Sequence, residues 1–156
     1  MNPEITKTIF RSRFPRLFLV RAIDRYEAEE RGLSGDRTWW LYMADFEFVS
    51  SKWGSIVVPE GMITDFASVP KIVQSVYPND DPILLYPSAA HDLLFQPRPD
   101  GSRGWLADGR QLSLEEANDV LIEGMFFCGA SVGDRVNVKI AVEIGNLDVK
   151  HRFRSE

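Results

Sequence analysis

The chain has 156 residues, of which 44% are hydrophobic and 26% are charged, and this composition is typical of one globular domain spanning 1–156. It excludes a disordered tail, a collagen-like fibre and a small disulfide scaffold. The net charge of −5 argues against a general nucleic-acid binder, whose affinity depends on neutralising phosphates. Cys128 is the only cysteine, so the sequence provides neither an internal disulfide bond nor a thiolate zinc site.

No segment of the sequence predicts export or membrane insertion. The first ten residues mix charged and apolar side chains and lack the apolar run of a signal peptide. No apolar stretch is long enough to cross a bilayer as a helix. We therefore expect a soluble cytoplasmic protein, with a solvated tail at 150–156.

The first half of the chain predicts an antiparallel sheet. Segments rich in aromatic and β-branched residues predict strands at 17–22, 39–49 and 55–58. Turn residues at 50–54 and 59–61 predict hairpins, which make a meander of three or four strands with the last at 62–65. The charged segment 24–37 is expected to be a surface excursion with a short helix.

The second half of the chain changes to helical spacing. Ser113 followed by Glu116 is a capping box, and apolar residues then recur at helical spacing until Gly129. Ser131 and Asp134 repeat this pattern at the start of another helix, which a glycine-asparagine pair ends. These are the two best-supported helices in the sequence.

Shorter helices are expected between the sheet and the capping boxes. Ser68 is placed to cap one of them, and Ser88 is placed to cap another that runs through 89–94. The proline- and glycine-rich segment 96–112 predicts a loop with a small hairpin around Trp105. The fold class is therefore α+β, with an N-terminal antiparallel meander followed by three or four helices packed on one face.

The His91-Asp92 pair interrupts an apolar segment and is the main candidate for a functional site. Histidine can act as a base or as a metal ligand, and aspartate binds hard cations. Alternatively, the two side chains have only a structural role, in which both are buried and hydrogen-bonded. This is the commoner outcome for an isolated His-Asp pair.

Two other polar positions can belong to the same site. Asp65, flanked by hydroxyl side chains, either approaches His91 or shares a cation with Asp92, or else it only caps the turn into the next helix. Asn118 lies on the capping-box helix, among acidic residues that favour a helix N-terminus.

These motifs occur in the order and at the spacing of a known family. The string Thr-Asp-Phe-Ala-Ser-Val-Pro at 64–70 is followed by Ala-Ala-His-Asp-Leu-Leu-Phe at 89–95 and by Glu-Ala-Asn at 116–118. Over about 39–145 the chain resembles a family of phage and prophage proteins known only as a domain of unknown function, DUF1353. The family usually has tyrosine in place of Phe95 and often aspartate in place of Asn118.

The two central helices are also similar to those of phospholipases A2, in which a His-Asp dyad faces an aspartate on the next helix. This resemblance implies that His91 is the general base, Asp92 a calcium ligand and Asn118 the orienting group. Asparagine cannot stabilise a charged imidazole, and the glycine-rich calcium loop is missing, so we expect weakened or absent catalysis. The candidate metal ligands are Asp92 and Asp65. His-Asp metal phosphohydrolases fit less well, because the chain offers only His151 as a further histidine.

Two functions follow from the resemblances. The first is a virion or tail-module component, made in the host cytoplasm, which docks other phage structural proteins through a sheet that carries Trp39, Trp40 and Trp53. Such a component can also be an oligomer. Its His-Asp cluster would then be vestigial. The second is an esterase-like hydrolase of the host envelope, with His91 as base and Ca²⁺ bound at Asp92.

Overall fold

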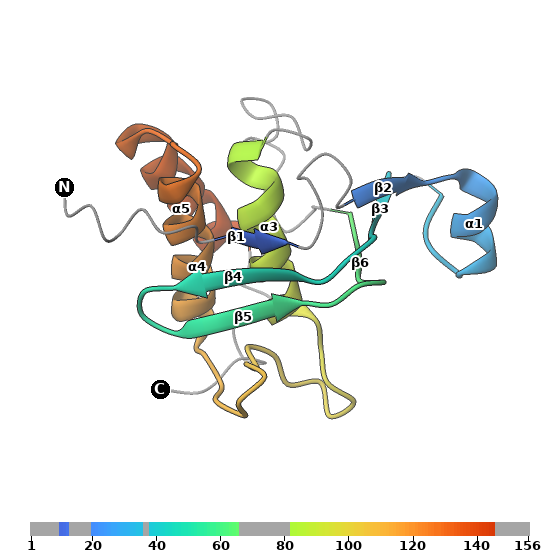
Figure 1. Cartoon of the computed structure of the whole chain (residues 1–156), viewed down its shortest axis with the longest axis horizontal. Coiled ribbons are helices and arrows are strands. Elements are labelled where there is room, and N and C mark those ends of the chain that lie inside the picture. The colour runs from blue at the N-terminus through green and yellow to red at the C-terminus, as the bar shows by residue number, and fades with distance from the viewer. Residues whose placement is uncertain (1–9, 13–19, 36–37, 66–81, 146–156) are drawn as a thin grey trace.

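The computed structural model describes residues 10–12, 20–35, 38–65 and 82–145. Strands occupy the N-terminal half and long helices follow, so the predicted α+β class is confirmed (Figure 1). The strands are β1 (Phe10–Ser12), β2 (Val20–Ile23), β3 (Trp39–Tyr42), β4 (Phe46–Ser50), β5 (Gly54–Val58) and β6 (Ile63–Thr64). The described helices are α1 (Arg25–Glu30), α3 (Pro82–Phe95), α4 (Leu114–Phe127) and α5 (Val132–Gly145).

The strands divide between two antiparallel sheets instead of continuing as one meander. One sheet has the order β1-β4-β5 and the other β2-β3-β6. The prediction of a single strand at 39–49 is therefore wrong, because the chain leaves one sheet after Tyr42 and enters the other at Phe46. Leu41 packs near α1 while Tyr42 enters the main core, so β3 is buried on both faces. The strand β1 was not predicted, and 13–19, which contains part of the strand expected at 17–22, lies outside the described residues.

The hairpin between β4 and β5 forms where the turn residues predict it. Its register runs from Phe46 opposite Val58 to Ser50 opposite Gly54. Ser50 Oγ accepts hydrogen bonds from the backbone N–H groups of Lys52 and Trp53, which closes the turn. The segment around Trp105 also forms the expected small hairpin, through a bridge to Gln111.

Helices α3 and α4 pack against the sheet that contains β4 and β5, and α5 packs against α4. The side chains of the main core come from both sheets, from α3 and α4, and from the loop that joins those two helices. Figure 1 shows α5 at one edge of the molecule, with α4 between it and α3, and α1 at the opposite edge. No helix in the described ranges is long and apolar enough to span a membrane.

Helix α3 begins earlier than the sequence analysis placed it. It starts at Pro82, whose fixed φ and missing N–H suit a first helical position. Ser88 therefore lies inside the helix, and the prediction that it is an N-cap is wrong. The helix expected after Ser68 lies in 66–81, outside the described residues.

The capping predictions for α4 and α5 are confirmed. Ser113 Oγ accepts from the backbone N–H of Glu116, and Glu116 Oε2 accepts from the backbone N–H of Ser113. Ser131 and Asp134 make the same reciprocal bonds at the start of α5. Helix α4 ends before Gly129, whose φ of 93° is in the left-handed region that favours glycine.

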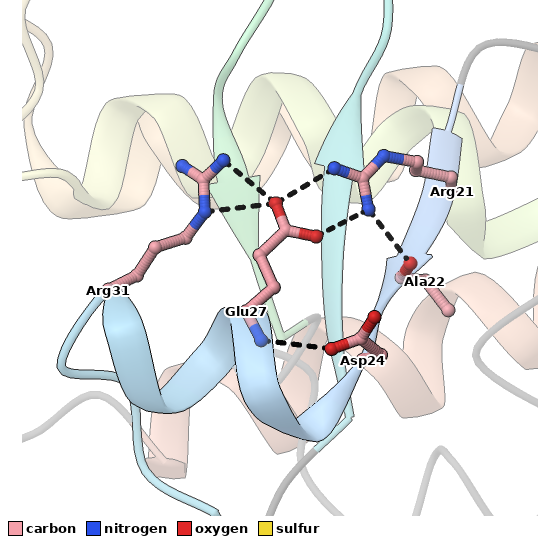
Figure 2. Close-up of polar contacts among 5 residues, drawn as sticks. All are labelled: Arg21, Ala22, Asp24, Glu27 and Arg31. Carbon is pink, nitrogen blue, oxygen red and sulfur yellow. Dashed lines mark hydrogen bonds and ion pairs between the residues drawn. The ribbon is translucent and has the colours of Figure 1, made fainter.

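The predicted surface helix in 24–37 is α1, capped by Asp24 (Figure 2). Its Glu27 carboxylate accepts two hydrogen bonds from Arg21 of β2, at 2.7 and 2.8 Å, and two from Arg31, at 3.0 and 2.8 Å. The hydrogen bonds from Arg21, followed by those from Arg31, lower the pKa of Glu27 from 4.5 to about 2. This carboxylate therefore joins α1 to the sheet.

The depressed pKa of Glu27 predicts an acid-dependent loss of stability. Its contribution is fully present above pH 4.5 and is lost as the pH falls through about 2, because protonation removes the charge that both arginines bind. Urea unfolding of the wild type and of Glu27→Gln should therefore give a stability difference that shrinks between these pH values. A difference that stays constant from neutral pH down to about 2 would contradict this assignment.

Candidate functional site

Five polar side chains lie together where β6, α3 and α4 meet, and we call them the polar cluster. They are Thr64, Ser88, His91, Asp92 and Asn118. His91 and Asn118 have no exposed surface, Ser88 is 1% exposed, and Asp92, at 7%, is the most exposed of the five. The structure therefore brings together His91, Asp92 and Asn118, the three predicted catalytic residues.

The imidazole of His91 connects α3 to α4. Its Nε2 lies 3.1 Å from Oδ1 of Asn118. Because a carboxamide oxygen only accepts hydrogen bonds, Nε2 carries the proton and donates it. In the neutral ring, Nδ1 is then left as an acceptor. Phe95, one turn further along α3, packs against the imidazole with the ring centroids 4.3 Å apart.

The carboxylate of Asp92 connects α3 to β6. Its Oδ2 accepts a short hydrogen bond from the Thr64 hydroxyl. Its Oδ1 lies 3.7 Å from His91 Nδ1, which is beyond hydrogen-bond distance. Burial raises the pKa of Tyr42 well above 10, and the nearby charge of Asp92 raises it further. The carboxylate therefore acts on β3 as well as on β6.

The polar cluster has more hydrogen-bonding capacity than its members satisfy. Among the residues that the structure describes, four buried side-chain atoms of the cluster find no hydrogen-bond partner: His91 Nδ1, Asp92 Oδ1, Asn118 Nδ2 and Ser88 Oγ. An unsatisfied buried polar atom costs about 1–3 kcal/mol, so sites with several of them are usually functional or hold ordered water. The unsatisfied atoms on α3 come from positions 88, 91 and 92, which share one side of the helix.

Asp65, the other predicted metal ligand, is half-buried beside the polar cluster. Successive side chains of an extended chain point to opposite sides, so the contact to Asp92 is made by Thr64 instead. Within 10–12, 20–35, 38–65 and 82–145, no group of three or more His, Cys, Asp or Glu side chains is placed to hold a metal ion. The contact from Thr64 was not predicted, although its hydroxyl lies within the motif that named Asp65.

The hydrogen bond from Thr64 predicts a matched pair of substitutions. Thr64→Val keeps the side-chain shape but removes the donor, so the buried Asp92 carboxylate loses a hydrogen bond to a charged group, worth about 1.5–3 kcal/mol. Thr64→Ser keeps the hydroxyl and should lose much less of the unfolding free energy. Urea denaturation measures both, and equal losses in the two variants would contradict this role, because they would show that the hydroxyl contributes no more than the methyl group at this position.

The fold and the site together define a small α+β protein with a solvent-excluded His-Asn pair next to an Asp-Thr pair. The chain belongs to the family described as "Protein of unknown function (DUF1353)", whose model matches residues 37–142. The matched segment contains all five residues of the polar cluster and the whole of α3 and α4. No curated protein and no solved structure matches the chain.

Proposed function

We propose that the chain is a phage- or prophage-encoded component of the virion or its tail module, in which the polar cluster is an internal brace. The observation that carries this proposal is the complete burial of His91 and Asn118, which hydrogen-bond to each other across two helices. A catalytic base must reach water or substrate, and an imidazole with no exposed surface reaches neither while the fold stays closed.

The residue opposite the imidazole also supports a structural role. Asn118 accepts the hydrogen bond from His91 but carries no charge, so it cannot stabilise an imidazolium formed during catalysis. In a brace the missing charge has no consequence, because the neutral carboxamide oxygen of Asn118 is sufficient to accept the hydrogen bond from a neutral imidazole. The polar cluster then fixes how α3 sits between β6 and α4.

Of the three tryptophans expected on the docking face of such a component, Trp53 is not available at the surface. Trp53 is buried in the main core, and Trp39 and Trp40 are half-buried against neighbouring side chains. Trp39 also donates from its indole to the Ser34 carbonyl at 2.8 Å. These rings therefore serve the fold, and the expectation that they supply a docking face is wrong for Trp53.

The composition of purified particles tests this proposal. Particles from a phage that carries this gene should contain the protein at a constant ratio to the known structural proteins, measured by quantitative mass spectrometry. Particles purified from a deletion strain, complemented with His91→Gln, should be as infectious as those complemented with the wild type, because glutamine can bond to Asn118 but is not a base. Absence of the protein from infectious particles would overturn the proposal.

One observation favours a second function, a base-assisted hydrolase. Nε2 of His91 is hydrogen-bonded to Asn118, while Nδ1 has no hydrogen-bond partner in the described part of the chain and lies 3.7 Å from the Asp92 carboxylate. If the site opens, Nδ1 can take a proton from water that attacks an ester. Hydrolysis of ester or phospholipid substrates by the wild type, and its loss in His91→Gln, would establish this function instead of the brace.

The residues of the polar cluster do not fit the calcium ion that the phospholipase resemblance implies. Ca²⁺ takes six to eight oxygen ligands, mostly from carboxylates and carbonyls. The polar cluster offers one carboxylate, already bonded through Oδ2 to Thr64 and flanked by an imidazole, and no carboxylate-rich group occurs in the described parts of the chain. The hydrolase alternative therefore rests on the imidazole alone.

A further inference from the structure

Helix α5 is apolar on two opposite sides. Its inner side buries Val138 and Val142 against α4. Its other side carries four β-branched residues spaced four apart, which we call the outer ridge: Val132 (68% exposed), Val136 (51%), Ile140 (51%) and Ile144 (65%). A helix that only covers a core has one apolar face, so the outer ridge indicates a second packing partner.

The outer ridge is unfavourable unless something packs against it. Valine and isoleucine are weaker helix formers than alanine, lysine or glutamate, so an exposed helix face gains nothing from them. Phe126, at the end of α4, adds a further 46%-exposed ring near this helix. Single exposed apolar residues are common on protein surfaces, but a contiguous apolar patch marks an interaction site.

The charges beside the outer ridge indicate what that partner is. Arg135, Lys139 and Glu143 form a parallel row, also spaced four apart. Lys139 bonds to Asp119 of α4 at 2.8 Å and lies 4.0 Å from Glu143. Arg135 stacks over the Phe126 ring and has no ion pair within the described ranges. The row thus has an unpaired cation at one end and a weakly paired anion at the other.

We propose that the outer ridge docks against the same ridge of a second copy of this chain, with the two α5 helices antiparallel. Ridges of residues four apart pack into the grooves of an identical helix surface at an angle of about 50°. A two-fold axis near the middle of α5 places Arg135 of each copy beside Glu143 of the other copy, while Lys139, which lies nearest the axis, is bonded to Asp119 of its own copy. A parallel pairing would place the two rows on opposite sides of the interface, so Arg135 and Glu143 would not meet. The charge row therefore favours the antiparallel dimer.

The expected dimer is weak. A helix of 14 residues is about 21 Å long, so an interface made by α5 and Phe126 is at or below the low end of specific interfaces, about 1,200 Å². We expect a dissociation constant in the range of about 1–100 μM, which corresponds to reversible dimerisation at ordinary laboratory concentrations. This inference concerns α5 alone and does not depend on the role of the polar cluster.

Sedimentation velocity over a concentration series tests whether the outer ridge forms the dimer. The wild type should shift from monomer to dimer between about 1 and 200 μM. Ile140→Lys places a charge in the middle of the ridge and should leave only monomer. Val57→Lys, the same kind of change on the exposed side of β5, is the matched control and should dimerise normally. A wild type that stays monomeric throughout, or equal dimerisation of the two variants, would overturn the proposal.

Charge exchange tests the antiparallel arrangement. Arg135→Glu and Glu143→Arg should each weaken dimerisation at least about tenfold, because each variant alone faces like charges. An equimolar mixture of the two should recover the wild-type affinity, since positions 135 and 143 again face opposite charges across the interface. Arg135 and Glu143 of one helix lie about 12 Å apart along its axis, so recovery must come from contacts between copies. A mixture that stays monomeric would overturn the antiparallel dimer.

Discussion

Asn118→Ala should lower the free energy of unfolding by about 2–3 kcal/mol. The substitution leaves the Nε2–H of His91 buried without an acceptor and opens a small cavity between α3 and α4. Asn137→Ala on the exposed side of α5 is the matched control and should change stability by no more than about 0.5 kcal/mol. Urea denaturation monitored by tryptophan fluorescence measures both variants.

A double-mutant cycle shows whether this cost belongs to the His91–Asn118 pair. His91→Leu alone leaves the Asn118 carboxamide unsatisfied, while the double variant removes both polar groups at once. The sum of the losses of unfolding free energy in the two single variants should therefore exceed the loss in the double variant by about 1–2 kcal/mol. Additive losses would mean that the two side chains contribute independently and that the brace between α3 and α4 does not exist.

Gly124→Ala should be as damaging as the loss of the brace, because it acts at the closest approach of the same two helices. A Cβ at this position of α4 would lie 2.8 Å from Cβ and 3.2 Å from Cα of Pro87 on α3. Since the Pro87 ring cannot rotate away, α3 and α4 must move apart, at a cost of about 1–3 kcal/mol or more.

The matched control for Gly124→Ala is Gly133→Ala on α5. There the new Cβ would meet only Ser131 Oγ, at 3.8 Å, which is ordinary contact. Alanine is a better helix former than glycine, so this variant should gain about 0.5–1 kcal/mol in unfolding free energy. Opposite signs for the two variants confirm that α4 needs glycine for close packing, and a neutral Gly124→Ala would show that α3 and α4 adjust freely.

The helices that carry their own end signals could be predicted from the sequence. Both capping boxes and the glycine that ends α4 act within four or five residues, so local chemistry determines where these helices begin and end. The only local signal that the described residues carry at the start of α3 is Pro82, which suits a first helical position. Ser88 resembles an N-cap, but the residues before it continue the helix back to Pro82 and fill the main core.

The split at Met43–Asp45 could not be predicted from composition. The segment 39–49 is mostly aromatic and apolar, and its two charged residues, Asp45 and Glu47, fit the alternation of a single half-buried strand. Only the tertiary structure shows that Leu41 and Tyr42 enter different cores. Propensity indicates that a segment is extended but not which strand it pairs with. The same limit explains why two sheets were predicted as one.

Three of the five residues of the polar cluster could be named from the sequence, but their contacts could not. The sequence patterns named His91, Asp92 and Asn118, and the structure places them together. The hydrogen bond from Thr64 to Asp92 depends on which side of β6 faces α3. The burial of the polar cluster depends on all the elements that pack around it. Neither property can be read from a pair of adjacent polar residues.

The reactivity of His91 toward diethyl pyrocarbonate tests the central claim most directly. His91 and His151 are the only histidines, so peptide mass spectrometry can follow each of them separately. A brace with no exposed surface predicts that His91 stays unmodified in the folded protein and reacts only after unfolding in urea. Modification of His91 in the native protein at the rate found in urea would contradict the brace, because it would show an imidazole that is open to solvent and able to act as a base.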